Sequence, residues 1–223
     1  MEPSFSSVVS SASVGIALVL IFGTLAVVAA ETKKRWLLAI SKPVATAALL
    51  LVVGPPPAYL VEKLVAFGIV FSIVGDALLV LEGDRAFIAG TSAFLTAQLL
   101  YAAAFWALRS PERPVAPVAA VVVVVSVLLV ANLWRGAGAL RPAVVIYAIA
   151  ITLMVGTALG TLGGPMRPLA ATCAAGGAVL FYISDATLAW DKFKRPVRHS
   201  AFVTMGVYWV GQIGIALAAR MSS

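Results

Sequence analysis

An apolar run of membrane length in this chain contains the sequence IVGDALL at residues 73–79, with Asp76 at its centre. Nearly the same sequence, YISDATL, occurs at residues 182–188, with Asp185 in the corresponding position. An ionisable side chain at membrane depth costs about 2.5–3.5 kcal/mol on insertion scales, so two of them need a reason. Either the two aspartates are polar groups that pack helices together, or they form one shared polar site near a membrane face. We favour the shared site.

The composition is that of an integral membrane protein. Hydrophobic residues make up 62% of the 223 residues and charged residues 11%, whereas soluble domains have about 45–50% and about 25%. The apolar runs are about 18–22 residues long, which suits helices that cross roughly 30 Å of hydrocarbon rather than the alternating strands of a barrel. We therefore predict an all-α fold, a polytopic helix bundle in a single transmembrane domain over residues 1–223.

Charges, prolines and glycines divide the chain into eight predicted transmembrane helices. We expect these helices over residues 8–30, 35–53, 59–81, 86–108, 115–134, 142–161, 168–190 and 199–219. Their connections are short and leave no room for a soluble domain. The two aspartate sequences fall in the third and seventh helices, four helices apart. This spacing suggests a tandem four-helix repeat in which both aspartates face the same side of the membrane.

The basic residues predict the orientation of the bundle. The first, third, fifth and seventh connections carry ten of them, namely Lys33, Lys34, Arg35, Arg85, Arg135, Arg141, Lys192, Lys194, Arg195 and Arg198. The other face carries five, namely Lys63, Arg109, Arg113, Arg167 and Arg220. The positive-inside rule then places the richer face in the cytoplasm and both termini outside.

The same charges bear on location and partners. Residues 1–13 contain Glu2 and no Lys or Arg, so we expect a retained first span rather than a cleaved secretory leader. The net charge of +7 lies in connections between spans, where it matches anionic lipid headgroups better than nucleic acid. We expect a protein of the inner (plasma) membrane whose partners are membrane lipids. The sequence sets no oligomeric state.

Three ionisable residues are predicted to lie at one depth. Asp76 and Asp185 each come six residues before the acidic residue that follows their helix, which places them roughly 9 Å inside the membrane face. Lys42 comes seven residues after the second helix begins, again about 10 Å from the same face. Lys42 either joins the aspartates or extends its long side chain to the interface.

Further polar residues in the predicted helices are candidates for binding substrate. Buried amides and hydroxyls need hydrogen-bond partners, and helix packing is the alternative role for each. The candidates are Lys42, Ser72, Gln98, Tyr101, Tyr147, Ser184, Tyr208 and Gln212. One histidine and one cysteine exclude a zinc site of His and Cys ligands from this chain alone. We expect no metal and no cofactor.

These residues resemble a known family, the lysoplasmalogenase family of YhhN-like membrane proteins. The matching sequences are SKP at 41–43, FSIVGD at 71–76 and GAVLFYISD at 177–185, with Phe87, Gly90, Phe94, Tyr101, Tyr147, Leu188, Ala189, Lys192, Phe193, Tyr208 and Gln212. They occur in order over most of the chain. One position departs from the pattern, because the family often has a histidine where this chain has Gln98. A glutamine forms hydrogen bonds but does not carry a proton near neutral pH.

The resemblance implies an eight-helix hydrolase that cleaves the vinyl ether of lysoplasmalogens, which are lysophospholipids, to a fatty aldehyde and a glycerophospho-alcohol. That reaction needs an acid, a carboxylate that stabilises positive charge, and a water molecule. Asp76 and Asp185 can divide these roles in a dry site, and the roles stay open between them. Lys42 would hold one aspartate ionised or receive the substrate phosphate. The alternatives are a proton-coupled transporter or lipid-binding protein that uses the same aspartates, and then a non-catalytic scaffold.

Overall fold

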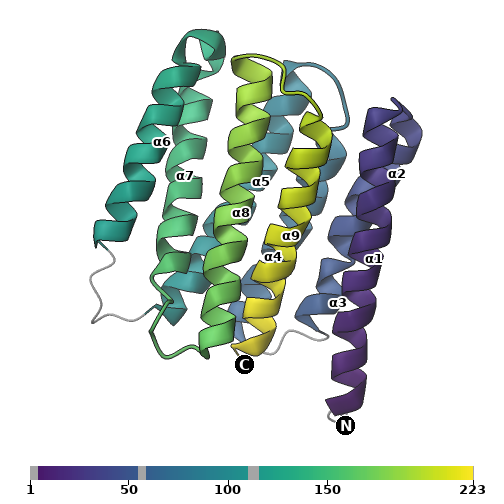
Figure 1. The fold of residues 1–223 in the computed structure, drawn as a ribbon, viewed down its shortest axis with the longest axis vertical. Coiled ribbons are helices and arrows are strands. Elements are labelled where there is room, and N and C mark those ends of the chain that lie inside the picture. The colour runs from purple at the N-terminus through teal and green to yellow at the C-terminus, as the bar shows by residue number, and fades with distance from the viewer. Residues whose placement is uncertain (1–4, 55–58, 110–115, 223) are drawn as a thin grey trace.

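The structure is a computed structural model that describes residues 5–54, 59–109 and 116–222. All regular secondary structure within these ranges is helical. The helices are α1 (Phe5–Glu31), α2 (Arg35–Ala47), α3 (Leu49–Val53), α4 (Leu60–Leu78), α5 (Asp84–Leu108), α6 (Ala116–Ala137), the short 3₁₀ helix η1 (Gly138–Leu140), α7 (Arg141–Leu159), α8 (Pro168–Phe193) and α9 (Ser200–Met221). The long helices run side by side as a bundle (Figure 1). The expected all-α fold is thus confirmed.

Within the described ranges, six helical segments are long and apolar enough to cross a membrane. The segment formed by α6, η1 and α7 counts as one of them, because these helices follow one another without a gap from residue 119 to residue 159. Helix α4 is not among the six and carries three charged residues, Glu62, Lys63 and Asp76. The predicted integral membrane protein is therefore supported by length and composition, whereas the number of crossings stays a prediction.

Two helices differ from their expected course. The helix expected over 35–53 is interrupted at Ala48, which separates α2 from α3. Pro43 lies inside α2 and does not end it, although proline removes one backbone hydrogen bond and often kinks a helix. Helix α4 ends at Leu78, three residues before the expected boundary, so Asp76 lies in its last turn.

Small residues allow two pairs of helices to pack very closely. A Cβ atom on Gly177 of α8 would lie 2.6 Å from the backbone oxygen of Gly211 on α9. A Cβ atom on Gly68 of α4 would lie 2.2 Å from the ring of Tyr101 on α5. Only glycine fits at these two positions without displacing its neighbours. Close approach of this kind stabilises helix pairs in lipid, where the hydrophobic effect does not drive association.

Both ends of the chain lie at the same end of the bundle (Figure 1). The connections 32–34, 79–83, 138–140 and 194–199 lie at the opposite end, which we call the basic end. Two salt bridges cross this end, Arg35 at the start of α2 to Glu82 at 2.5 Å and Lys192 of α8 to Asp84 at the start of α5 at 3.2 Å. The proline-rich connections predicted around residues 55–57 and 111–114 lie outside the described residues.

Candidate active site

Asp76 is bound by side chains from two other helices. Lys42 Nζ, from α2, lies 3.1 Å from Asp76 Oδ1. Thr46, one turn further along α2, donates its hydroxyl to Asp76 Oδ2 at 2.5 Å. Tyr208 on α9 donates its hydroxyl to the same oxygen at 3.0 Å. The three neighbours are all hydrogen-bond donors, which is the set that a carboxylate requires.

This ion pair is buried. The Asp76 side chain is 1% exposed and the Lys42 side chain 12%. Lys42 therefore binds the aspartate and does not extend to the interface, which was the alternative for this residue. Removing either partner of such a pair leaves an uncompensated charge in a medium that solvates it poorly.

A chain of hydrogen bonds extends from Tyr208 toward α4 and α5. Gln212 Nε2 on α9 donates to Tyr208 Oη at 3.2 Å and to Ser72 Oγ on α4 at 3.0 Å. Tyr101 on α5 donates its hydroxyl to Gln212 Oε1 at 2.9 Å. The four side chains are fully or almost fully buried. They satisfy one another, as polar groups in a low-dielectric interior must.

Asp185 on α8 is bound by a second pair of helices. Gln98 Nε2, from α5, donates to Asp185 Oδ2 at 2.9 Å. Tyr147, from α7, donates its hydroxyl to the same oxygen in a short hydrogen bond. Since both donors use Oδ2, the other carboxyl oxygen is the one left to meet another molecule.

Asp185 lines a cavity and Asp76 does not. The cavity has a volume of about 80 Å³, and its walls come from α5, α6, α7 and α8, with Leu79 just after α4 and Leu140 of η1. Phe94, Tyr147 and Tyr182 contribute aromatic surface beside Asp185, and most other wall residues are aliphatic. The ring of Phe94 also packs edge-on against Tyr208, with centroids 5.8 Å apart. Phe94 thus lies between the Asp185 cavity and the Asp76 cluster.

Of the ten site residues predicted from the sequence, nine contribute to these two clusters. Only Asp185 and Tyr147 line the cavity itself. Ser184 is different, because its hydroxyl donates to the backbone oxygen of Thr204 on α9 at 2.9 Å. It therefore joins α8 to α9 and does not contact the aspartates in this structure.

Thr46 and Trp209 were not predicted from the sequence. Thr46 is fully buried and bonds Asp76, and Trp209 Nε1 donates to Thr46 Oγ1 at 3.3 Å. One signal was present in the sequence, because Thr46 follows Lys42 by four residues and so lies on the same helix face. Trp209 carried no such signal, because it meets Thr46 only when α9 and α2 come together in the folded bundle.

Known proteins are similar in sequence to most of this chain. The model of the YhhN family matches residues 36–219. Lysoplasmalogenase TMEM86B of Homo sapiens is 35% identical over 202 residues, 86% of this chain and 79% of that protein. Lysoplasmalogenase TMEM86A of Bos taurus is 35% identical over 154 residues, 68% of this chain. The match spans 63% of the length of the cattle protein. No solved structure matches this chain. Because the family match includes both aspartate helices and most of the sequence, this chain belongs to the YhhN family.

Proposed function

We propose that this protein is an intramembrane hydrolase that cleaves the vinyl ether bond of lysoplasmalogen-like lysophospholipids. The products are a fatty aldehyde and a glycerophospho-alcohol. The relatives named lysoplasmalogenase support the reaction class. The observation that carries the proposal is the position of Asp185, which lines an apolar cavity while two side chains hold one of its oxygens.

The cavity lining suits a lipid whose reacting bond lies beside its hydrocarbon chain. A vinyl ether connects the glycerol oxygen directly to the chain, so the reactive carbons must lie among apolar side chains. The walls around Asp185 are apolar or aromatic, with Leu129, Ile151 and Phe94 among them. A small polar metabolite would gain little from such a surface.

In the proposed mechanism Asp185 is the acid. Protonated Oδ1 gives its proton to the alkene carbon that does not bear oxygen, and the alkene electrons form the new C–H bond. The neighbouring carbon and the ether oxygen then share a positive charge as an oxocarbenium ion. Water attacks that carbon and loses a proton to Asp185, which restores the acid. The hemiacetal breaks its bond to the glycerol oxygen, the oxygen takes the hydroxyl proton, and the aldehyde leaves.

Asp76 has a different role in this proposal. Its donor set of ammonium and hydroxyl groups suits a permanent carboxylate rather than an acid. A fixed negative charge behind Phe94 stabilises the oxocarbenium ion, because electrostatic interactions are strong in a dry interior. Lys42 then holds the Asp76 carboxylate in place and does not bind the substrate phosphate. Of the predicted pair, Asp185 thus acts as the acid and then as the base, and Asp76 acts only through its charge.

We also propose eight crossings and a tandem four-helix repeat, with α2, α4 and α5 of the first half corresponding to α7, α8 and α9 of the second. The side chains that bind the two aspartates support this correspondence between the halves. Asp76 on α4 is bound from α2 and α9, and Asp185 on α8 is bound from α7 and α5. Each carboxylate thus receives one donor helix from its own half and one from the other. The basic end faces the cytoplasm in this proposal.

The deciding experiment incubates detergent-purified protein with a lysoplasmalogen and measures the release of fatty aldehyde. Release by the wild-type protein, and its loss in Asp185→Asn at equal expression, would support the hydrolase. Uptake of the intact lipid into vesicles without aldehyde release would instead support the transporter alternative. Release at the wild-type rate by Asp185→Asn would contradict the role of Asp185 as the acid.

A further inference from the structure

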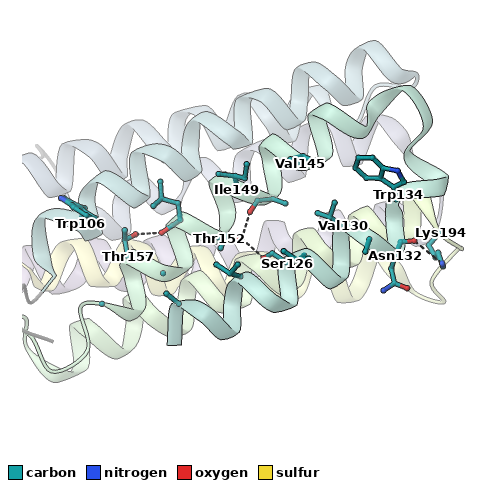
Figure 2. Close-up of a pocket in the computed structure, with 18 of the residues that line it drawn as sticks. Trp106, Ser126, Val130, Asn132, Trp134, Val145, Ile149, Thr152, Thr157 and Lys194 are labelled. Atoms are coloured by element: carbon teal, nitrogen blue, oxygen red, sulfur yellow. Dashed lines mark hydrogen bonds between the residues drawn. The ribbon is translucent and has the colours of Figure 1, made fainter. Parts of the chain in front are cut away.

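A second and much larger hollow lies between α5, α6 and α7. This groove has a volume of about 1130 Å³, against about 80 Å³ for the Asp185 cavity. Figure 2 shows Trp106 at one end of the groove, Ser126 and Thr152 in the middle, and Asn132, Trp134 and Lys194 at the other end. The latter end belongs to the basic end of the bundle, where α6 and α8 finish.

The charges of the groove have one sign. Its lining includes the cations Arg109, Arg135 and Lys194, and no Asp or Glu occurs among the described residues that line it. Arg135 and Lys194 both lie at the basic end, where Lys194 Nζ donates to the backbone oxygen of Asn132 at 3.3 Å. Two cations in a groove whose described lining holds no carboxylate favour a phosphate group, as basic pockets between membrane helices bind lipid headgroups.

A close contact joins the end of α6, which carries Arg135, to the end of α8, which Lys194 follows. A Cβ atom on Gly136 of α6 would lie 1.6 Å from the backbone oxygen of Phe193 on α8. Gly136 follows Arg135, and Phe193 precedes Lys194. The absence of a side chain at Gly136 therefore lets the end of α8 place Lys194 beside α6.

The rest of the groove suits a hydrocarbon chain. Val123, Val127 and Ile149 line it and are 48%, 60% and 63% exposed, so its wall is open to the bilayer. From residue 119 to residue 135, α6 rises about 24 Å. That length approaches the roughly 30 Å of a hydrocarbon core. A single acyl chain lying along α6 would cover these side chains.

The groove and the Asp185 cavity are separated by one thin wall. Val130 of α6 and Ala148 of α7 line both of them. Hydrogen bonds connect α6, α7 and α8 at this wall. Ser126 Oγ of α6 lies 2.6 Å from Thr152 Oγ1 of α7 and 2.9 Å from Tyr182 Oη of α8. A lipid in the groove is thus one side chain away from the Asp185 cavity.

We propose that the groove is a lysophospholipid-binding site that receives the substrate from the bilayer. Arg135 and Lys194 hold the phosphate, and the single chain lies along α6 and α7. The choice of a lysophospholipid rests on the proposed function, whereas the phosphate and the chain follow from the groove itself. Passage of the lipid into the Asp185 cavity then requires only local separation of α6 from α7 and α8.

The test measures equilibrium binding of a radiolabelled saturated 1-O-alkyl lysophosphocholine to the full-length protein in nanodiscs. This probe has no vinyl ether, so its binding is read without catalysis. The double variant Arg135→Gln/Lys194→Gln should bind it roughly tenfold more weakly or worse. The matched control is Arg195→Gln/Arg198→Gln, which removes two charges at the same end that do not line the groove and should bind normally.

A second variant changes the groove without changing its charge. Val127 lines the groove and not the Asp185 cavity, so Val127→Trp should fill the groove and weaken probe binding. With lysoplasmalogen as substrate, both groove variants should raise KM severalfold at unchanged kcat, because they remove binding and not chemistry. Normal probe binding by both groove variants would overturn the proposal, as would equal loss in the control.

The outcomes distinguish a failure of the proposed lipid site from a failure of the proposed hydrolase function. Groove-dependent probe binding by a protein that releases no aldehyde supports the lipid site and contradicts the hydrolase. Disulfide cross-linking between two Val127→Cys copies in native membranes, with Cys173 replaced by Ala, would place a second copy of the chain over the groove. That result would overturn the lipid site whatever the catalytic outcome.

Discussion

Lys42 on α2 and Asp76 on α4 form an ion pair of 3.1 Å that is almost completely shielded from solvent. Both residues were expected at one depth, but their contact depends on how α2 packs against α4. The pair joins two helices, and it supplies the fixed carboxylate of the proposed mechanism. Its energetics therefore provide the first prediction.

We expect Lys42→Met and Asp76→Asn each to destabilise the protein, by about 3–5 kcal/mol, because each leaves a buried group without its charged partner. The double variant Lys42→Met/Asp76→Asn should recover much of that loss, since no unpaired charge remains. Thermal unfolding in detergent, followed by the loss of monodisperse protein, measures all three. Additive destabilisation in the double variant would contradict a coupled pair.

The two aspartates should also act together in turnover. We expect Asp185→Asn to abolish most aldehyde release with a normal folded yield, because it removes the proton donor. Asp76→Asn should also lose most activity, and the double change should cost little more than either alone, as residues that act as a unit are non-additive. Comparison of kcat at matched amounts of folded protein gives the answer. Wild-type turnover by either single variant would return that aspartate to helix packing.

Gln98 should affect chemistry more than binding, because it contacts Asp185 itself. Asp185 becomes a carboxylate as it gives up its proton, and loss of a hydrogen bond to a charged group costs about 1.5–3 kcal/mol. Gln98→Ala should therefore lower kcat roughly ten- to hundredfold with little change in KM. Gln98→His keeps an N–H donor and introduces a group that titrates near neutral pH. Its activity should exceed that of the alanine variant and depend on pH between about 5 and 8. Unchanged activity in both variants would remove α5 from the site.

Two neighbouring glycines give a matched test of how α8 packs against α9. A Cβ atom on Gly177 would meet backbone atoms of Gly211 and Ile215 at 2.6 and 2.8 Å, whereas one on Gly176 would have nothing within 4 Å. Gly177→Ala should therefore lower the midpoint of thermal unfolding, because backbone cannot move aside easily. Gly176→Ala should leave it unchanged or raise it slightly, since alanine favours helix. Equal midpoints would show that α8 and α9 adjust without cost.

The orientation of the bundle is tested by labelling. In a Cys173→Ala background, cysteines at Gly83 and Lys194 should react only with reagents that reach the cytoplasm, because both positions lie at the basic end. A cysteine at Ser222, near the other end, should react from outside intact cells. Labelling of Gly83→Cys and Lys194→Cys from outside would reverse the orientation, and with it the face from which the proposed site is reached.

The helical class and the site aspartates were accessible to sequence reasoning for simple physical reasons. Helical membrane spans bury their backbone hydrogen bonds within each segment, so length and hydropathy are enough to recognise them. Asp76 and Asp185 stood out because charge is costly at membrane depth. The interruption at Ala48 had no such signal, since Pro43 marked a different position and the helix continues through it.

The sequence by itself determined that this is an all-helical membrane protein with two related aspartates near one face. The difference between these aspartates was decided by tertiary structure alone. Asp76 meets Lys42 across α2 and α4, while Asp185 meets Gln98, 87 residues away, and lines a cavity. Similar local sequences cannot encode this difference, because the partners come from other helices. Which helices meet depends on how closely backbones pack, and that is settled by the bundle as a whole.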